Sequence, residues 1–271
     1  MLSVDSLRFG YGDDSPVLTD VTFSAGAGEV MAIVGRNGAG KSTLLRLLNG
    51  LLQPASGRVI VNGNATARTP VHLLAREIGT VFQAPEQQIF APKVAEEIAF
   101  GPRRLGLRGA ALKARVADVL LRVGLADVAD RHPLDLDAAA LRFVALGSVL
   151  AMRPPIMLLD EPQRGLDAAS LARLESIVAE EAAGGRALLI VCHDMEFVAR
   201  RASRVLALAG GRVAADLPTQ EFFTDPALMA AAGVEAPDPL VLAQLLGLAP
   251  QLTATALAQA WIAQRAEVAG A

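Results

Sequence analysis

The chain has 271 residues, a formal net charge of −3 and a single cysteine, Cys192. This length allows one large domain of about 200 residues with a small addition, the slightly acidic balance argues against general nucleic-acid binding, and one cysteine excludes an internal disulfide and a Cys/His metal cluster. No apolar run reaches the roughly 18 residues of a membrane-spanning helix, and the N-terminus lacks the basic and apolar segments of a signal peptide. We therefore expect a cytoplasmic protein, for which other chains supply any membrane spans.

The first third of the chain is predicted to contain four strands and one helix. Alternating or apolar runs between glycine and proline residues are typical of strands, and they occupy residues 2–9, 17–23, 30–34 and 58–62. The run 30–34 leads into a glycine-rich loop, and a helical pattern begins at Thr43. A strand, a glycine loop and a helix in this order are the arrangement that binds a nucleotide triphosphate.

The glycine loop supplies the candidate nucleotide-binding residues. Without Cβ atoms the loop can curl so that backbone N–H groups and the positive end of the new helix face the β-phosphate. Lys41 then reaches the β- and γ-phosphate oxygens, and the Ser42 hydroxyl ligates Mg²⁺. A glycine turn that binds nothing is the alternative for this motif by itself. The candidates are Gly35, Asn37, Gly38, Ala39, Gly40, Lys41, Ser42 and Thr43.

Helices are predicted after Gln83, over residues 94–100 and 110–123, because charged residues alternate with apolar ones at helical spacing. Strands and helices then alternate from residue 156 to residue 213, which is typical of a doubly wound sheet. From Pro218 onward the pattern predicts short alanine-rich helices. These are interrupted at Pro226, Pro237, Pro239 and Pro250.

Two later strands end in polar residues suited to phosphate chemistry. The apolar run 155–159 leads into Asp160 and Glu161, as expected of a buried parallel strand that delivers acids to its C-terminal edge. Asp160 is predicted to accept hydrogen bonds from the ligands around Mg²⁺, and Glu161 is predicted to polarise the attacking water. The run 187–192 ends in His193, which places an imidazole at the same edge. A solvated acidic pair and a structural histidine are the alternatives for each segment alone.

The order of these segments resembles that in the nucleotide-binding subunit of an ATP-binding cassette (ABC) transporter. Tyr11 is similar to the aromatic residue that stacks on adenine, Gln83 to the glutamine that joins the metal site to the membrane partner, and His193 to the switch histidine. Gly165-Leu166-Asp167 resembles the loop that communicates across the dimer. The resemblance implies ATP and Mg²⁺ as cofactors, with Mg²⁺ held by Ser42, Gln83 and Asp160. It implies a catalytic group of Glu161, His193 and Gln83.

The resemblance also implies the fold class. We expect an α/β ABC nucleotide-binding domain with a P-loop α/β core, an antiparallel β subdomain, a helical signature lobe and a small helical C-terminal extension. The ATPase domain is predicted over residues 1–217, with the lobe at about 84–152, and the extension over 218–271.

The segment from Gln83 to Gly101 resembles the corresponding stretch of energy-coupling-factor importers, including their cobalt, nickel and vitamin members. Ile89 and Phe90 are apolar residues in a polar loop, which suits a small patch for docking the coupling helix of a transmembrane partner. The alternative is that both fold inward as core. The segment from Ala227 to Leu240 resembles the C-terminal extension of the same group.

One segment departs from the family. Where the dimer signature Leu-Ser-Gly-Gly-Gln is expected, this chain has Leu136-Asp137-Ala138-Ala139-Ala140. In the family this helix start grips the γ-phosphate bound by the opposite subunit. Asp137 remains a good N-cap, but a carboxylate about 4 Å from a phosphate charge costs on the order of 4 kcal/mol at an effective dielectric near 20. Either Asp137 turns away and hydrolysis persists, or the signature is impaired and turnover is slow; the sequence favours the second.

The resemblance therefore implies a motor subunit. Two copies of the chain, or this chain and a homologous ATPase, would hold ATP between them and move a transmembrane partner, which places the chain peripherally at the cytoplasmic face of the membrane. Cobalt or nickel is the preferred cargo and a vitamin such as biotin the alternative. A second hypothesis is a nucleotide-sensing or structural subunit that scarcely hydrolyses ATP.

Overall fold

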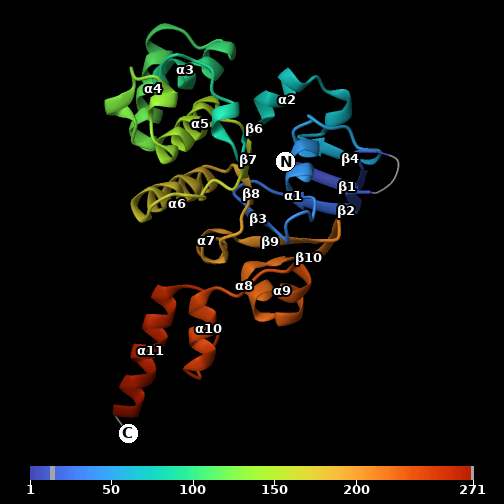
Figure 1. Ribbon diagram of the computed structural model, residues 1–271, viewed down its shortest axis with the longest axis vertical. Helices are drawn as coiled ribbons and strands as arrows, with labels where there is room; N and C mark the ends of the chain where they lie inside the picture. Colours follow the sequence, from blue (N-terminus) through green and yellow to red (C-terminus); the bar gives the residue numbers. More distant parts are fainter. Residues whose placement is uncertain (13–15, 270–271) are drawn as a thin grey trace.

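In the described part of the chain, residues 1–12 and 16–269 of a computed structural model, the strands form two β-sheets (Figure 1). The smaller sheet is antiparallel, with the order β2-β1-β4-β5. Its strands are β1 (Leu2–Phe9), β2 (Leu18–Ala25), β4 (Ser56–Val61) and β5 (Asn64–Ala65). The predicted antiparallel part of the fold is confirmed, although β2 ends at Ala25 instead of residue 23.

The larger sheet has six strands in the order β10-β9-β3-β8-β7-β6. All neighbours are parallel except β10, which runs antiparallel to β9 at one edge. The strands are β3 (Val30–Val34), β6 (Ile78–Val81), β7 (Ile156–Asp160), β8 (Ala187–Val191), β9 (Arg204–Ala209) and β10 (Arg212–Pro218). This is the mixed α/β architecture that the sequence predicts.

Two hydrophobic cores lie on opposite faces of the six-stranded sheet. Along β3, Val30 and Val34 point into the core shared with the helices that follow β6 in the chain. Met31 and Ile33 point into the other core, which is shared with the first helix and the antiparallel sheet. Because side chains alternate along a strand, each central strand is buried on both faces. The continuous apolar runs of the sequence arise from this double burial.

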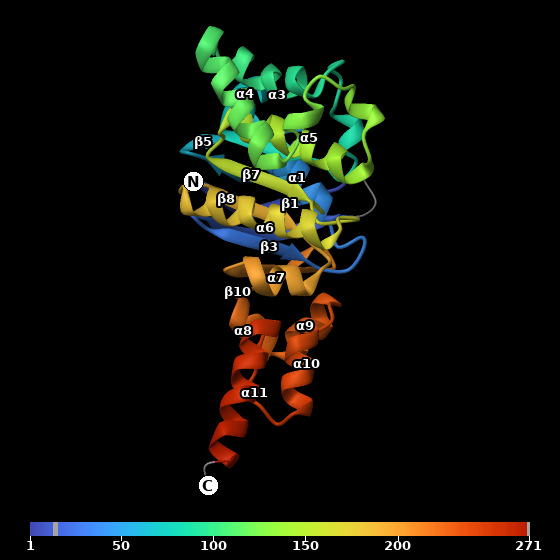
Figure 2. The ribbon, with the colours of Figure 1, turned by 90° about the vertical axis from the view of Figure 1, so that its left-hand side faces the viewer.

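Helices cover both faces and one end of the six-stranded sheet. They are α1 (Lys41–Leu48), α2 (Val71–Glu77), α3 (Val94–Arg104), α4 (Gly109–Val123), α5 (Ala138–Met152), α6 (Ala168–Ala183) and α7 (Met195–Arg201). Figure 2 shows α6 and α7 on one face and the helical lobe, α3–α5, at one end of the molecule. Helix α3 runs past its expected end at residue 100, through Pro102, because Val94 and Ile98 are fully buried and tertiary packing overrides the breaker.

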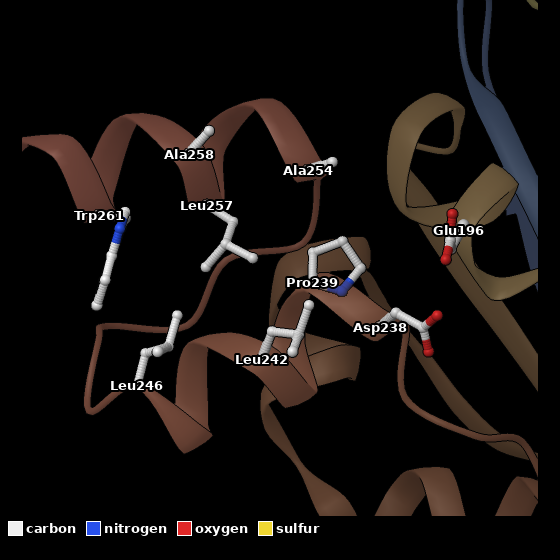
Figure 3. A pocket seen from close by; sticks show the side chains of 9 residues that line it. All are labelled: Glu196, Asp238, Pro239, Leu242, Leu246, Ala254, Leu257, Ala258 and Trp261. Carbon is white, nitrogen blue, oxygen red and sulfur yellow. The ribbon is translucent and has the colours of Figure 1, made fainter.

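The C-terminal extension consists of α8 (Thr219–Thr224), α9 (Pro226–Ala232), α10 (Asp238–Leu245) and α11 (Ala254–Ala269). Pro226 and Pro239 lie in first turns, where the missing N–H costs nothing, so they start helices instead of interrupting them. Helix α11, with 16 residues, is also longer than predicted. Helices α10 and α11 face each other across an apolar cavity of about 370 Å³ (Figure 3).

The boundary at residue 217 and the limits of the helical lobe stay predictions, and residues 270 and 271 of the extension lie outside the described residues. Among residues 1–12 and 16–269, none of the helices combines the length and the apolar character needed to cross a bilayer.

Candidate functional site

The glycine loop, the Asp160-Glu161 pair and His193 lie at one edge of the six-stranded sheet. Each follows the carboxyl end of a parallel strand, β3, β7 or β8. Ile33 is in register with Val191, and Val191 with Asp160, so the three strand ends lie level with one another. This is the edge at which open α/β sheets bind ligands. The fold therefore brings together segments that are more than a hundred residues apart in the chain.

The loop after β3 requires glycine at two of its positions. Gly35 has φ +144, and a Cβ there would lie 2.3 Å from the Leu208 carbonyl oxygen. Gly40 has φ +97, and its Cβ would lie 2.6 Å from Leu18 Cδ2. An L side chain at either position would be strained and would clash. The loop can therefore lie tightly over the sheet and begin α1 directly at Lys41.

Lys41 is buried and is held by the loop that it ends. Its Nζ donates to the Gly35 carbonyl at 2.6 Å and to the Arg36 carbonyl at 2.9 Å. Burial lowers the pKa of Lys41, whereas the charges of Glu161 and Asp160 act in the opposite direction. The ammonium group is thus placed between the loop and the acidic pair, where it can meet an anion that enters the loop.

Asp160 is only 8% exposed and lies with Ser42 beside Lys41. Burial raises the pKa of Asp160, while hydrogen bonding with the Ser42 hydroxyl and the charge of Lys41 oppose this increase. A hydroxyl and a carboxylate are hard oxygen ligands, and Mg²⁺ is commonly held by one or two such groups together with substrate phosphates. The residues present therefore fit Mg²⁺.

The Glu161 carboxylate is the meeting point of three segments. Gln83 donates from Nε2 to Glu161 Oε2 at 3.2 Å, and His193 Nε2 lies 3.4 Å from Glu161 Oε1. Arg164 approaches the same carboxylate at 3.6 Å. The backbone of Glu161 has φ +51, a left-handed conformation that is uncommon outside glycine, and its N–H donates to the Val191 carbonyl at 3.0 Å. The backbone therefore leaves the extended conformation of β7 at this residue.

His193 faces the same group from the end of β8. Burial lowers the pKa of His193 below its ordinary value of 6.5, and Lys41 adds to this effect, while Glu161 opposes it. The imidazole is therefore neutral at pH 7, with one nitrogen available to donate and one to accept. A neutral histidine beside the Glu161 carboxyl group can orient water or a phosphate oxygen.

Tyr11 lies beside the start of α1 and is 62% exposed. Its hydroxyl is 3.2 Å from Thr43 Oγ1, and its ring meets Phe9 edge to face with centroids 4.9 Å apart. These contacts leave the ring accessible for stacking. Of the remaining loop candidates, Asn37 and Gly38 are exposed and Ala39 is buried.

Asp137 lies at the start of α5, in a cavity that Lys41, Asp160, Glu161 and His193 do not line. It caps α5, with its side chain accepting from Ala140 N at 2.8 Å, so the expected capping role is present. Asp137 and Asp167, the caps of α5 and α6, line one cavity of about 500 Å³. A contact of Asp137 with a nucleotide on an opposite subunit stays a prediction.

The two apolar residues near Gln83 have different surroundings. Phe90 is 65% exposed, and its ring meets that of Phe100 edge to face at 4.7 Å, with Arg104 stacked on Phe100. Ile89 is half-buried and packs against the core of the helical lobe. The patch is therefore made by Phe90 and Phe100, whereas Ile89 packs against the core.

Two arginines at the site are not among the residues that the sequence predicts. Arg164 reaches Glu161 at 3.6 Å, and Arg142 donates to the Gln83 carbonyl at 3.5 Å. The spacing of Glu161 and Arg164, three residues apart, is a usable signal for such an ion pair. Arg142 gives no comparable signal, because its partner is 59 residues away in the chain.

Cys192, which lies between β8 and His193, offers a probe of the site. It is 1% exposed, and burial raises the pKa of its thiol to about 12. Because the thiolate is the reactive form, a rise from 9.0 to about 12 lowers its fraction at pH 8 by about a thousandfold. We expect a thiol reagent at pH 8 to label the folded chain at least about 100-fold more slowly than the denatured chain. Equal rates would contradict the burial of this strand end.

Comparisons with known proteins agree with this geometry. The family model described as "ABC transporter" matches residues 18–164. The energy-coupling factor transporter ATP-binding protein EcfA of Methanothermobacter thermautotrophicus is 37% identical over 239 residues, which cover 88% of this chain and 77% of that protein.

Solved structures give the same result. The structure of cbiO1 from Clostridium perfringens, described as part of the ABC transporter complex cbiONQ, has a TM-score of 0.76 and 30% identity, and the match covers 91% of this chain and 98% of that one. A structure described as the ATP binding subunit of an ABC transporter has a TM-score of 0.77 at 27% identity, covering 86% and 95%.

Proposed function

Because the chain belongs to the ABC transporter family, whose ATP-binding domains are P-loop ATPases, we propose that it hydrolyses ATP to power an importer of the energy-coupling-factor type. The observation that carries the proposal is the convergence of Gln83 and His193 on the Glu161 carboxylate, next to the buried Lys41. This arrangement joins a phosphate-binding loop to a group suited to activating water.

The loop residues bind and orient the nucleotide. Backbone N–H groups of the loop and the start of α1 face the phosphates, and Lys41 exchanges its contacts with loop carbonyls for phosphate oxygens. Tyr11 offers its exposed ring to the adenine. Ser42, Gln83 and Asp160 would hold Mg²⁺, which would neutralise charge on the phosphates.

Glu161 and His193 carry out the proton chemistry. Glu161 lies where its carboxylate accepts a proton from the attacking water, and Gln83 fixes one of its oxygens at 3.2 Å. The neutral His193 donates to the γ-phosphate and holds it in line. Release of Gln83 from Glu161 would signal the state of the nucleotide to the adjoining helical lobe.

ABC ATPase subunits work as dimers with transmembrane partners. For this chain we propose a homodimer or a dimer with a homologous ATPase, peripheral at the cytoplasmic face of the cell membrane.

The likeness to EcfA and to cbiO1 supports an energy-coupling role, and cobalt or nickel is the proposed cargo. The test is uptake of ⁵⁷Co²⁺ or ⁶³Ni²⁺ by vesicles that contain the chain and its copurifying membrane protein, with ATP supplied on the side of the chain. Uptake of biotin instead of the metal ions would show that the cargo is a vitamin. If neither the metal ions nor biotin are taken up, the chain does not power an importer of these substrates.

A second candidate function is an ATP-binding subunit with little hydrolysis, which the segment Leu136–Ala140 favours. The closed dimer would place Asp137 near a phosphate charge, and the Cβ atoms of Ala138 and Ala139 would limit how closely the backbone approaches. In the described structure, however, Asp137 accepts from Ala140 N at 2.8 Å. This contact holds the carboxylate at its own helix and favours continued activity.

Restoring the signature distinguishes these two functions. If the carboxylate opposes closure, Asp137→Ser with Ala138→Gly and Ala139→Gly raises ATP turnover by about tenfold or more, since about 1.4 kcal/mol of relief is tenfold in an equilibrium constant. The measurement is steady-state hydrolysis together with dimer formation on ATP. Asp118→Ser, which removes an exposed carboxyl group of α4 outside this segment, is the control for loss of an acidic side chain. An unchanged rate in the triple variant would show that the native signature is competent.

The exposed patch at Phe90 provides a test of the membrane partner. We expect Phe90→Asp to reduce copurification of the transmembrane protein by about tenfold, because the change puts a charge into an apolar contact, while ATP binding by the isolated chain is retained. Leu121→Asp, at a residue that is 71% exposed on α4, is the control. A fall in melting temperature with Phe90→Asp but not with Leu121→Asp would instead make Phe90 part of the core.

A further inference from the structure

The C-terminal extension touches the nucleotide loop at one glycine. Gly233, which follows α9, has φ +65, and a Cβ built there would lie 2.1 Å from Arg36 Nε, 2.2 Å from Cγ and 2.6 Å from Cδ. The stem of the Arg36 side chain therefore lies directly across the Gly233 backbone. Arg36 follows Gly35 in the glycine loop, so a segment near the end of the chain contacts the loop that receives phosphate.

Arg36 links this contact to Lys41. The backbone carbonyl of Arg36 accepts from Lys41 Nζ at 2.9 Å and from Ala39 N at 3.1 Å. The Arg36 side chain is exposed and its stem packs on Gly233, while its backbone carbonyl closes the turn of the loop and accepts from the buried ammonium group.

Helix α9 is a firm support for this contact. It packs against β9 and β10, with Met229 and Ala232 buried in the main core. Asp225 caps its first turn by accepting from Ala227 N at 2.9 Å and Leu228 N at 3.2 Å. Its last turn closes through Gly233 N to the Ala230 carbonyl at 3.1 Å. The position of Gly233 is therefore set by the sheet that carries the loop.

The segment between α9 and α10 also lies close to His193, at the edge of the sheet that carries the candidate nucleotide site. Residues 233–238 and residues 193–196 line one cavity of about 510 Å³. Glu196 of α7 and Asp238 of α10 both also line the cavity between α10 and α11 (Figure 3). The extension thus lies against both the loop after β3 and the segment that begins with His193.

We propose that Gly233 and Arg36 are positioning residues through which the C-terminal extension holds the nucleotide loop in its ATP-binding shape. The contact preorganises the loop, so less ordering is required when ATP binds. This inference rests on the proposed ATP binding at the loop and adds a determinant of affinity that lies outside the ATP contacts.

The chain contains a matched pair of glycines for the test. Gly247 follows α10 as Gly233 follows α9, with φ +67 and the same closing hydrogen bonds, from Gly247 N to the Gln244 carbonyl and from Leu248 N to the Ala243 carbonyl. A Cβ on Gly247 meets nothing within 4 Å. Gly233→Ala and Gly247→Ala therefore introduce the same backbone strain, and only the first displaces Arg36.

We expect Gly233→Ala to raise the Kd and the KM for Mg-ATP about three- to tenfold with kcat changed less than twofold, and Gly247→Ala to leave all three within about twofold. Melting temperatures of the two variants should fall by similar amounts. Equal ATP affinity in the two variants would overturn the proposal. If Lys41→Ala weakens ATP binding at least tenfold while Gly233→Ala behaves as Gly247→Ala, the further inference fails and the proposed function stands.

Substitutions of Arg36 give an independent arm that does not depend on glycine strain. Arg36→Ala should reproduce the loss of affinity, and Gly233→Ala should add nothing further in that background. Arg36→Met keeps an unbranched stem over Gly233 without the charge and should retain the affinity of the parent. If Arg36→Met loses as much affinity as Arg36→Ala, the guanidinium acts by its charge and the packing proposal is wrong.

Discussion

Glu161→Gln should lower ATP hydrolysis by about 10²- to 10⁴-fold while ATP binding is retained, because the amide keeps the size of the side chain but cannot take a proton from water. Gln83 and His193 would still face an oxygen or nitrogen at this position, so the group should remain assembled. The measurement is single-turnover hydrolysis together with calorimetry of Mg-ATP binding. Dimers trapped by ATP should also become easier to detect.

A control separates this effect from a general loss of charge. Glu96→Gln changes an exposed glutamate of α3 and should leave hydrolysis unaltered. If Glu161→Gln hydrolyses ATP at the parent rate, another group activates the water, and the convergence of Gln83 and His193 on this carboxylate is structural.

Lys41→Ala should weaken Mg-ATP binding by about 10- to 150-fold, since hydrogen bonds to a charged group contribute about 1.5–3 kcal/mol. The variant removes the ammonium group that lies between the loop carbonyls and the acidic pair. Folding should persist, because burial already disfavours the charged form of Lys41. Binding is measured by calorimetry and folding by the melting temperature.

Lys113→Ala, at an exposed lysine of α4, is the matched control for Lys41→Ala. It should bind Mg-ATP as tightly as the parent. Unchanged binding and unchanged hydrolysis in Lys41→Ala would remove the glycine loop from the ATP site.

The central part of the fold could be predicted because it depends on short-range patterns. Residues 30–34 are apolar at every position, since β3 is buried on both faces of its sheet, and the loop glycines follow at once. The carboxyl ends of parallel strands share an edge, so the order of segments in the chain places Lys41, Asp160 and His193 near one another before any distance is known.

The contacts between distant elements could not be predicted in the same way. Nothing in the spacing of Gly233 indicates that it lies on Arg36, about two hundred residues earlier, because the contact depends on how α9 packs against β9 and β10. The left-handed backbone of Glu161 likewise occurs together with a hydrogen bond from its N–H to the Val191 carbonyl on a neighbouring strand, a long-range contact. For Pro102, the local rule gave the wrong helix end because burial of α3 outweighed it.

At Glu161, the residue that would make the fold more stable is not the residue that the proposed hydrolysis requires. Strain of about 1–2 kcal/mol is carried at a position where glycine would relieve it. Directed evolution that selects for thermal stability alone would therefore favour glycine at position 161 and yield a more stable but inactive protein. Any such campaign on this scaffold needs simultaneous screening for turnover.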